Sequence, residues 1–174
     1  MLINLSDVLS EQHKPIVTDV VSEMTEVRFP FGTFPITEKH PVHMEISHVK
    51  GKELLIKGSA DFYVVIPCDR CLDDVTEVLE LQFSKEVDLD KKAADEAESD
   101  ETNYIDGYYL DVDQLLYNEI LIGWPMKILC CNDCKGICNG CGQNLNQGAC
   151  DCEDTSLDPR MSVVRDLFKN FKEV

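Results

Sequence analysis

The sequence predicts an α+β protein, an antiparallel β meander or open barrel with a few helices, followed by a cysteine-rich segment. Between residues 42 and 89 apolar side chains alternate with polar ones, as in strands that bury one face. After residue 111 the apolar side chains recur at helical spacing instead. Seven of the nine cysteines then fall between Cys130 and Cys152, at the short spacings typical of metal ligands.

The first 40 residues predict a strand at the N terminus, and no further element is assigned before Pro41. The segment up to residue 30 is polar with short apolar runs, and Pro30, Gly32 and Pro35 interrupt the residues after it. Pro41 is predicted to start the next element.

The meander itself is predicted from three strands. Val42, Met44 and Ile46 lie on one face of the first strand. The sequence Lys50-Gly51-Lys52 predicts a hairpin turn, and residues 53–66 form a long second strand. The pair Cys68 and Cys71 then turns the chain, and residues 73–89 return as the third strand.

The next segment, residues 86–106, carries nine acidic side chains and two lysines. Low hydrophobicity and like charge predict a solvated, mobile loop, and the alternative is a receptor for a basic partner. Residues 104–110 predict another short strand. Asp111 is a suitable N-cap for the next helix, and Gly123 with Pro125 predicts its end.

We expect two parts in the chain. Residues 1–126 form a β-rich domain that contains the acidic loop 86–106. Residues 127–174 form a cysteine-rich knuckle segment with a terminal helix, packed on the first part. That helix is predicted to start at Asp158-Pro159, and its apolar stripe either docks on the core or presents a face to a partner.

Four of the cysteines are predicted to form one closed metal site. Cys138-x2-Cys141 and Cys150-x-Cys152 are separated by a loop long enough to double back, and four thiolates suit a tetrahedral zinc ion. Such a closed site has no open position for water or substrate, so it would be structural. An iron–sulfur cluster and unligated thiols are the alternatives.

The other five cysteines predict a second zinc site. Cys68 and Cys71 cannot complete a tetrahedral site alone, and Cys134 is the best third ligand. Cys130 is the fourth ligand, with Cys131 as the alternative to it. Closing a loop of about 60 residues costs little more than closing a short one, so the separation is no objection. The sequence therefore predicts two structural zinc ions and one spare thiol.

Charge limits the partners of the protein. The formal net charge is −17, and two tetrathiolate zinc sites would bring it to about −21. Such a surface repels the phosphates of nucleic acids and attracts a basic protein, although acidity also serves solubility alone. The first residues lack signal-peptide features and no segment is apolar enough to span a membrane, so we expect a cytoplasmic protein with reduced thiols.

Enzymatic motifs are missing from the sequence, which contains no P-loop, GxGxxG, GxSxG or HExxH. A thiol oxidoreductase would place its CxxC before a helix, whereas Cys68 and Cys71 precede a predicted strand. We therefore expect a protein that is not an enzyme, with CxxC oxidoreductase chemistry as the weaker alternative.

The succession of these segments resembles the YceD family, the large ribosomal RNA subunit accumulation proteins, from about residue 40 to 170. The segments that carry the resemblance are Pro67-Cys68-Asp69-Arg70-Cys71-Leu72, the acidic loop, Asp111 with its helix, Pro125-Met126, Cys134-Lys135-Gly136-Ile137-Cys138, Cys141-Gly142-Gln143-Asn144-Leu145-Asn146, Cys150-x-Cys152 and Asp158-Pro159-Arg160.

This resemblance implies a non-enzymatic role in ribosome biogenesis, in the accumulation of large-subunit ribosomal RNA. Combined with the acidity, it suggests that the protein binds a basic large-subunit ribosomal protein. The alternative is direct binding of ribosomal RNA, with the zinc module as a knuckle. Its phosphate contacts would then be the basic residues Arg160, Arg165, Lys169 and Lys172.

Overall fold

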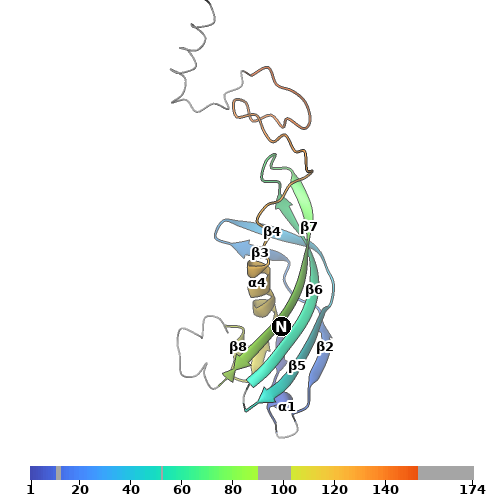
Figure 1. Cartoon of the computed structure of the whole chain (residues 1–174), viewed down its shortest axis with the longest axis vertical. Coiled ribbons are helices and arrows are strands. Elements are labelled where there is room, and N and C mark those ends of the chain that lie inside the picture. The colour runs from blue at the N-terminus through green and yellow to red at the C-terminus, as the bar shows by residue number, and fades with distance from the viewer. Residues whose placement is uncertain (11–12, 52, 90–102, 153–174) are drawn as a thin grey trace, which may run out of the picture. The chain divides into compact units, whose positions relative to one another are not determined.

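The computed structural model describes residues 1–10, 13–51, 53–89 and 103–152, which form eleven named elements (Figure 1). In chain order these are β1 (Leu2–Asn4), α1 (Ser6–Leu9), β2 (Ile16–Val20), β3 (Glu26–Phe29), β4 (Gly32–Lys39), β5 (Val42–Lys50), β6 (Glu53–Pro67), β7 (Asp74–Asp88), β8 (Ile105–Asp106), β9 (Tyr109–Asp111) and α4 (Val112–Ile122). The predicted terminal helix lies outside the described residues.

The chain divides into two compact units. The first consists of Met1–Ile66 and Thr76–Met126, and the second of Pro67–Val75 and Lys127–Val174, which is described as far as residue 152. The predicted boundary after residue 126 coincides with one of these divisions, but the turn at residues 67–75 was expected in the β-rich part. The packing of the cysteine-rich segment on the β-rich domain stays a prediction.

The predicted antiparallel meander is present as a six-stranded sheet in the first unit. β6 pairs with β5, β4 and β7, while β2 pairs with β5 and β3 with β4. In the described part of the chain β7 pairs with β6 alone, so the sheet is open and does not close into a barrel. A smaller antiparallel sheet has the order β1-β9-β8.

β4 and β5 together run along β6 as one interrupted strand. Lys39 lies opposite Phe62, and His43 lies opposite Ser59. Three residues, 40–42, therefore lie between Lys39 and His43, whereas only two, 60 and 61, lie between Ser59 and Phe62 on β6. One extra residue on one of two paired strands is a β-bulge. Pro41 lies inside this bulge, where a missing backbone N–H does not interrupt the ladder.

Three strands, β2, β3 and β4, lie before residue 40, where the sequence predicts only a strand at the N terminus. Pro35 is tolerated within β4 because it lies opposite Glu26 of β3, while pairing with β6 starts only at Ile36. Phe29 and Phe34 pack against Trp124, with ring centroids 4.7 Å and 4.9 Å from the indole. Tertiary contacts therefore stabilise strands that the local sequence does not predict.

The two ends of the predicted loop at residues 86–106 belong to strands, since β7 continues to Asp88 and β8 begins at Ile105. Between them, residues 90–102 lie outside the described part. The helix after Asp111 is confirmed: its carboxylate accepts hydrogen bonds from the backbone N–H groups of Asp113 and Gln114 at 3.1 Å and 3.4 Å.

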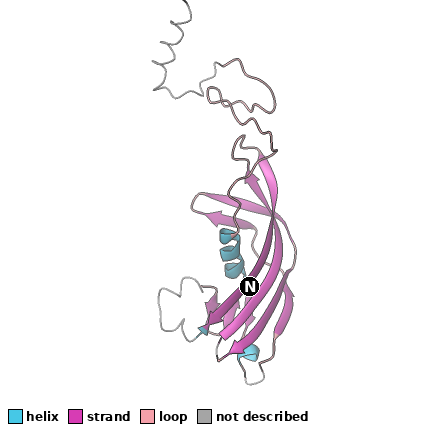
Figure 2. Cartoon of the chain, viewed as in Figure 1, coloured by secondary structure: helices cyan, strands magenta, loops and turns pink. Residues whose placement is uncertain are grey.

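The core of the first unit is built from alternate side chains of the long strands. α4 lies beside the curved main sheet and contributes four buried apolar side chains (Figure 2). The fully buried side chains of strands and helix include Val42, Met44, Ile46, Leu54, Ile56, Phe62, Val64, Val112, Leu115, Leu116 and Ile120. No helix within the described ranges is long and apolar enough to cross a membrane.

Gly58 occupies a core-facing position of β6, where the alternation calls for an apolar side chain. The ring of Phe83 takes the space that a side chain would fill, and a Cβ atom there would also lie 3.0 Å from the backbone oxygen of His43. Phe83 itself is buried. The glycine thus lets an aromatic side chain of the neighbouring strand cover the backbone.

We therefore predict that Gly58→Val lowers the free energy of unfolding by about 1–3 kcal/mol, because the new side chain overpacks the site of the Phe83 ring. Urea denaturation followed by circular dichroism would measure the change. Ser59→Val, on the exposed face of the same strand, is the matched control and should shift stability by less than about 0.5 kcal/mol. Equal stability of the two variants would contradict the packing argument.

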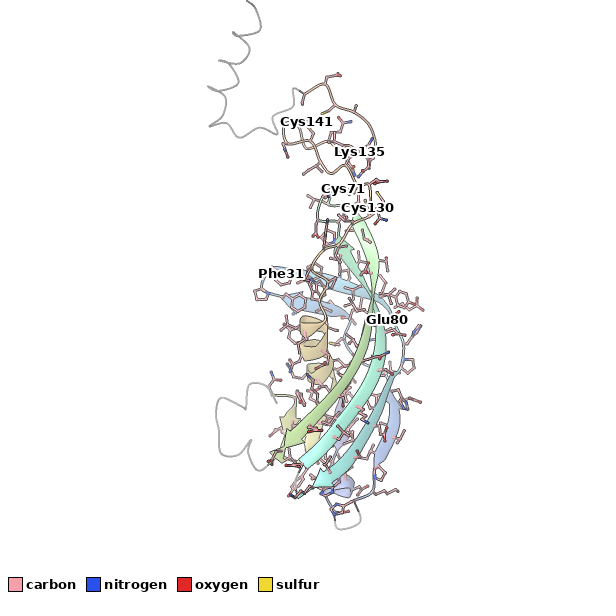
Figure 3. The ribbon with its side chains drawn as sticks, viewed as in Figure 1. Phe31, Cys71, Glu80, Cys130, Lys135 and Cys141 are labelled. Atoms are coloured by element: carbon pink, nitrogen blue, oxygen red, sulfur yellow. The ribbon has the colours of Figure 1, made fainter. Side chains whose placement is uncertain are left out.

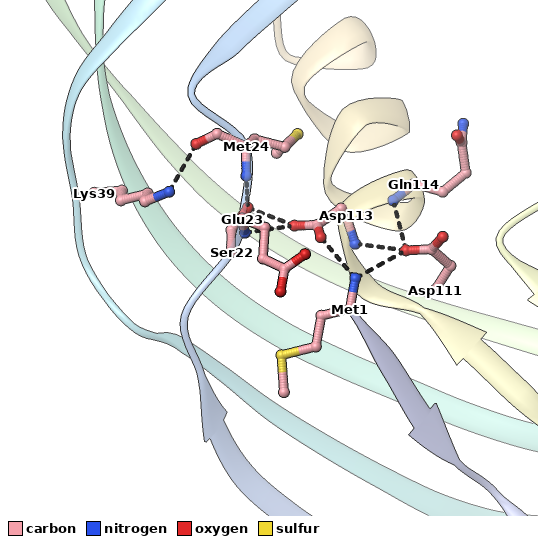
Figure 4. A network of polar contacts seen from close by, with 8 residues as sticks. All are labelled: Met1, Ser22, Glu23, Met24, Lys39, Asp111, Asp113 and Gln114. Carbon is pink, nitrogen blue, oxygen red and sulfur yellow. Dashed lines mark hydrogen bonds and ion pairs between the residues drawn. The ribbon is translucent and has the colours of Figure 1, made fainter.

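Asp113 joins three segments of the first unit through a network of polar contacts (Figure 4). The amino group of Met1 donates to its Oδ2 at 2.7 Å, and the Ser22 hydroxyl and the Glu23 backbone N–H donate to its Oδ1 at 2.6 Å and 3.1 Å. Burial favours the neutral acid, but the hydrogen bonds from Met1 and Ser22 outweigh it and lower the pKa of Asp113.

The low pKa of Asp113 predicts a loss of stability in acid. Its contribution is complete above the pKa of an aspartate in the unfolded chain and disappears as the pH falls through the lower folded-state pKa. Asp113→Asn should reduce stability at pH 7 by about 1–3 kcal/mol and weaken the acid dependence. Unfolding free energies measured between pH 7 and pH 3 test this, with the exposed Asp106→Asn as control. An unchanged pH dependence would contradict it.

Candidate metal centres

Eight of the nine cysteines of the second unit gather into two groups of four. In each group the four sulfur atoms lie within 4.8 Å of one another, and all nine thiols are free. The earlier cluster consists of Cys68, Cys71, Cys130 and Cys134. The later cluster consists of Cys138, Cys141, Cys150 and Cys152.

The earlier cluster is built on the turn after β6. The backbone N–H of Cys68 donates to the carbonyl of Asp73 at 2.8 Å, and that of Leu72 donates back to Cys68 at 3.0 Å. Asp69 anchors the second segment: its N–H donates to the carbonyl of Ile128 at 2.9 Å, and its carboxylate accepts from the Ile128 N–H at 2.7 Å. These bonds bring the thiols at residues 130 and 134 to the turn.

The sulfur separations of the earlier cluster suit a tetrahedral ion. Zinc–sulfur bonds of about 2.3 Å place the sulfur atoms of a tetrahedral site roughly 3.8 Å apart. The sulfur atoms of Cys68 and Cys134 are 3.8 Å apart, and those of Cys71 and Cys130 are 3.4 Å apart (Figure 3). Cys68, Cys71 and Cys134 are almost completely buried, so solvent does not compete for their sulfur atoms.

Cys130 and Cys131 are the two predicted candidates for the fourth position, and the structure places Cys130 in the cluster. The Cys131 sulfur lies 3.9 Å from that of Cys130 and is exposed. The carbonyl of Cys131 accepts a hydrogen bond from the N–H of Cys134 at 3.2 Å, so its backbone belongs to the same turn. Cys131 is the spare thiol of this arrangement.

The later cluster forms on a turn that contains two glycines. The backbone N–H of Gly140 donates to the Cys138 sulfur at 3.3 Å, and that of Gly142 donates to the Cys138 carbonyl at 2.8 Å. Gly142 has a φ of 74°, in the left-handed region that favours glycine. The thiols of Cys141 and Cys152 are exposed, so this cluster is more open to solvent than the earlier one.

Each cluster contains a thiol that ionises easily. Burial opposes ionisation of Cys68, but the backbone N–H groups of Cys71, Arg70 and Cys130 lower its pKa to about 6. Backbone N–H groups of Cys141 and Gly140 lower the pKa of Cys138 to about 6 in the same way.

Cys130 and Cys152 instead resist ionisation, because neighbouring sulfur atoms raise the pKa of each. The neighbouring Cys141 sulfur raises the pKa of Cys152 to about 12. Four thiolates this close can form together only if a positive ion compensates their charge, and binding a divalent metal then releases protons. The donor set therefore fits a soft divalent metal ion such as zinc, held by the four cysteines of each cluster.

Two side chains for which the sequence predicts no role also support the earlier cluster. Arg70 donates through Nη1 to the carbonyl of Cys134 at 2.7 Å. Asn146 donates through Nδ2 to the Cys134 sulfur at 3.3 Å, and this bond is the main cause that lowers the pKa of Cys134. Contacts of this kind orient the ligands of metal sites, but spacing alone does not reveal them.

Comparison with known proteins gives one match. A family model described as "Large ribosomal RNA subunit accumulation protein YceD" matches residues 56–168, which include both clusters. No curated protein and no solved structure matches the chain.

We predict that the protein, purified with its thiols reduced, binds two zinc ions per chain. Cys68→Ser and Cys141→Ser should each lower the content to one ion, because each removes a ligand from a different cluster. Cys131→Ser is the matched control and should retain two ions. Elemental analysis by mass spectrometry measures the ratio. Metal-free wild-type protein, or the loss of an ion in the Cys131 variant, would contradict the assignment.

Proposed function

The chain belongs to the YceD family, and from this premise we propose that it supports the accumulation of large-subunit ribosomal RNA as a non-enzymatic factor. In this proposal it binds a basic protein of the large ribosomal subunit through an acidic surface, in the cytoplasm. The two four-cysteine clusters would hold structural zinc ions that shape the second unit.

The observation that carries the proposal is the net charge of −17 on 174 residues. An excess of this size produces a negative potential over much of the surface, which speeds encounters with a basic protein and slows those with nucleic acid. In this proposal the bound ribosomal protein reaches the large subunit, and ribosomal RNA accumulates because assembly of the subunit proceeds.

The outer face of the main sheet is the best described candidate for the acidic surface. We define it by four carboxylates, Asp19, Glu45, Asp61 and Glu80, which lie on β2, β5, β6 and β7 at strand positions next to buried ones. Glu80 is labelled in Figure 3. Lys57 lies opposite Glu45 on the same face. Carboxylates thus outnumber cations here.

A shallow groove of about 500 Å³ runs across this face. It is lined by His43, Glu45, Lys57, Ser59, Gln82 and Ser84 among others. The imidazole of His43 contacts Asp19 at 2.7 Å, so this carboxylate already has one hydrogen-bonding partner. An extended basic peptide would find the Glu45 carboxylate and the hydroxyls of Ser59 and Ser84 for its side chains along such a groove.

The oxidoreductase alternative draws support from the low pKa of Cys68, but its surroundings oppose it. A redox thiol must reach an incoming disulfide, whereas Cys68 and Cys71 are buried. The strand β7, and not a helix, follows their turn. The direct RNA-binding alternative depends on residues 160–172, which lie outside the described part of the chain.

Binding to purified basic large-subunit ribosomal proteins should be detectable at about 10 mM salt and fall steeply by 150 mM. The reason is that the screening length shrinks from about 30 Å to about 8 Å. Glu45→Lys combined with Glu80→Lys should raise the dissociation constant at low salt by about tenfold. Fluorescence anisotropy measures both effects.

The matched control for these reversals is Asp106→Lys, which reverses an exposed carboxylate on the smaller sheet. It should change the affinity by less than the sheet-face variant. Absence of binding at low salt, or binding that ignores salt, would refute the charge argument. Tight binding of large-subunit RNA fragments in a gel-shift assay would instead favour the direct RNA role.

A further inference from the structure

The loop between Cys141 and Cys150 folds back on the chain segment that joins the two clusters. Asn144 forms a β-bridge with Ile137, and the N–H of Leu145 donates to the carbonyl of Gly136 at 2.9 Å. The N–H of Cys138 donates to the carbonyl of Gln143 at 2.8 Å. A loop that both starts and ends at ligands of the later cluster therefore lies against residues next to the earlier cluster.

Asn146, in this loop, contacts the earlier cluster directly. Its Nδ2 donates to the sulfur of Cys134 at 3.3 Å, and its Oδ1 accepts from the N–H of Lys135 at 2.8 Å. Cys134 is 2% exposed, so this hydrogen bond to sulfur is shielded from water. Both polar atoms of the Asn146 side chain therefore hold Cys134 of the earlier cluster, one through its sulfur and one through the backbone of the next residue.

Asn144 holds Asn146 in place and makes a second connection. Its Oδ1 accepts from the N–H of Asn146 at 2.9 Å, and its Nδ2 donates to Asp73 at 2.6 Å. The same carboxylate oxygen of Asp73 lies 3.4 Å from the sulfur of Cys71. Two ligands of the earlier cluster are therefore reached from the loop of the later one.

We infer that the two clusters bind metal cooperatively, and that Asn146 is the positioning residue that couples them. An ion in the later cluster ties Cys141 to Cys150 and so restricts the loop between them. Placing Asn146 on Cys134 costs conformational entropy, because the loop must be ordered. When the later cluster already holds an ion, the loop is ordered beforehand, so the earlier cluster binds its ion without this cost. Linkage makes the effect reciprocal: an ion in the earlier cluster must favour the later one by the same factor.

The coupling has an expected size. Removing a hydrogen-bonding partner of a metal ligand typically weakens metal affinity by about 10- to 100-fold. Filling the later cluster should therefore strengthen binding at the earlier cluster by up to that factor. Sites that share a chain but no such contact would fill independently.

Titration of the reduced, metal-free full-length chain with Co²⁺ tests this, because thiolate-bound cobalt absorbs visible light. Cys150→Ser disables the later cluster and should weaken Co²⁺ binding at the earlier one by about 10- to 100-fold. Asn146→Ala should do the same in the chain with all nine cysteines. In the Cys150→Ser background, however, Asn146→Ala should add less than threefold, since the loop is no longer held.

Asn139→Ala is the matched control, because Asn139 is an exposed asparagine of the later knuckle whose side chain hydrogen-bonds to no described residue. It should leave both affinities within about twofold. The reciprocal measurement uses Cys71→Ser, which should weaken the later cluster by the factor that Cys150→Ser imposes on the earlier one.

Native mass spectrometry gives a second readout that needs no cysteine variant. At one equivalent of Co²⁺ the singly loaded form should be more abundant in Asn146→Ala than in the wild type. Equal amounts in the two proteins would overturn the proposal. Equal effects of Asn146→Ala with and without Cys150 would also overturn it, because the hydrogen bond would then act on the earlier cluster alone.

Discussion

The pairing of the turn at Cys68 and Cys71 with the segment at Cys130 and Cys134 is the constraint on which the second unit depends. The sulfur atoms of Cys71 and Cys130 meet although 59 positions separate them in the chain. The loop that they close contains β7, β8, β9 and α4. A metal clip that closes so long a loop restricts the unfolded chain more than a local knuckle does.

Charge links the metal clusters to the proposed function. Four thiols within 4.8 Å cannot all ionise without a cation, and a tetrathiolate ion still leaves a net negative site. With zinc bound, the clusters would therefore add negative charge to an already acidic protein instead of offsetting it. A scaffold of this kind would suit the proposed factor, whose partner is cationic.

Sequence patterns predict the fold correctly where the signal is local. Alternation located β5, β6 and β7, and Asp111 marked the start of α4. The patterns did not predict β2, β3 and β4, because the short apolar runs and Pro35 give no local signal for a strand. These strands are stabilised by contacts with distant segments, such as those of Phe29 and Phe34 with Trp124. The roles of Arg70 and Asn146 also depend on contacts between segments that sequence spacing does not specify.

By itself the sequence determined the knuckles Cys68-x2-Cys71 and Cys138-x2-Cys141, because a two-residue spacing brings two thiols together within a single turn. It also determined the family and the acidity. Only the tertiary structure decided that Cys130, and not Cys131, joins Cys68, Cys71 and Cys134. Adjacent residues direct their side chains differently, so the choice between them depends on how the backbone at residue 130 approaches the turn after β6.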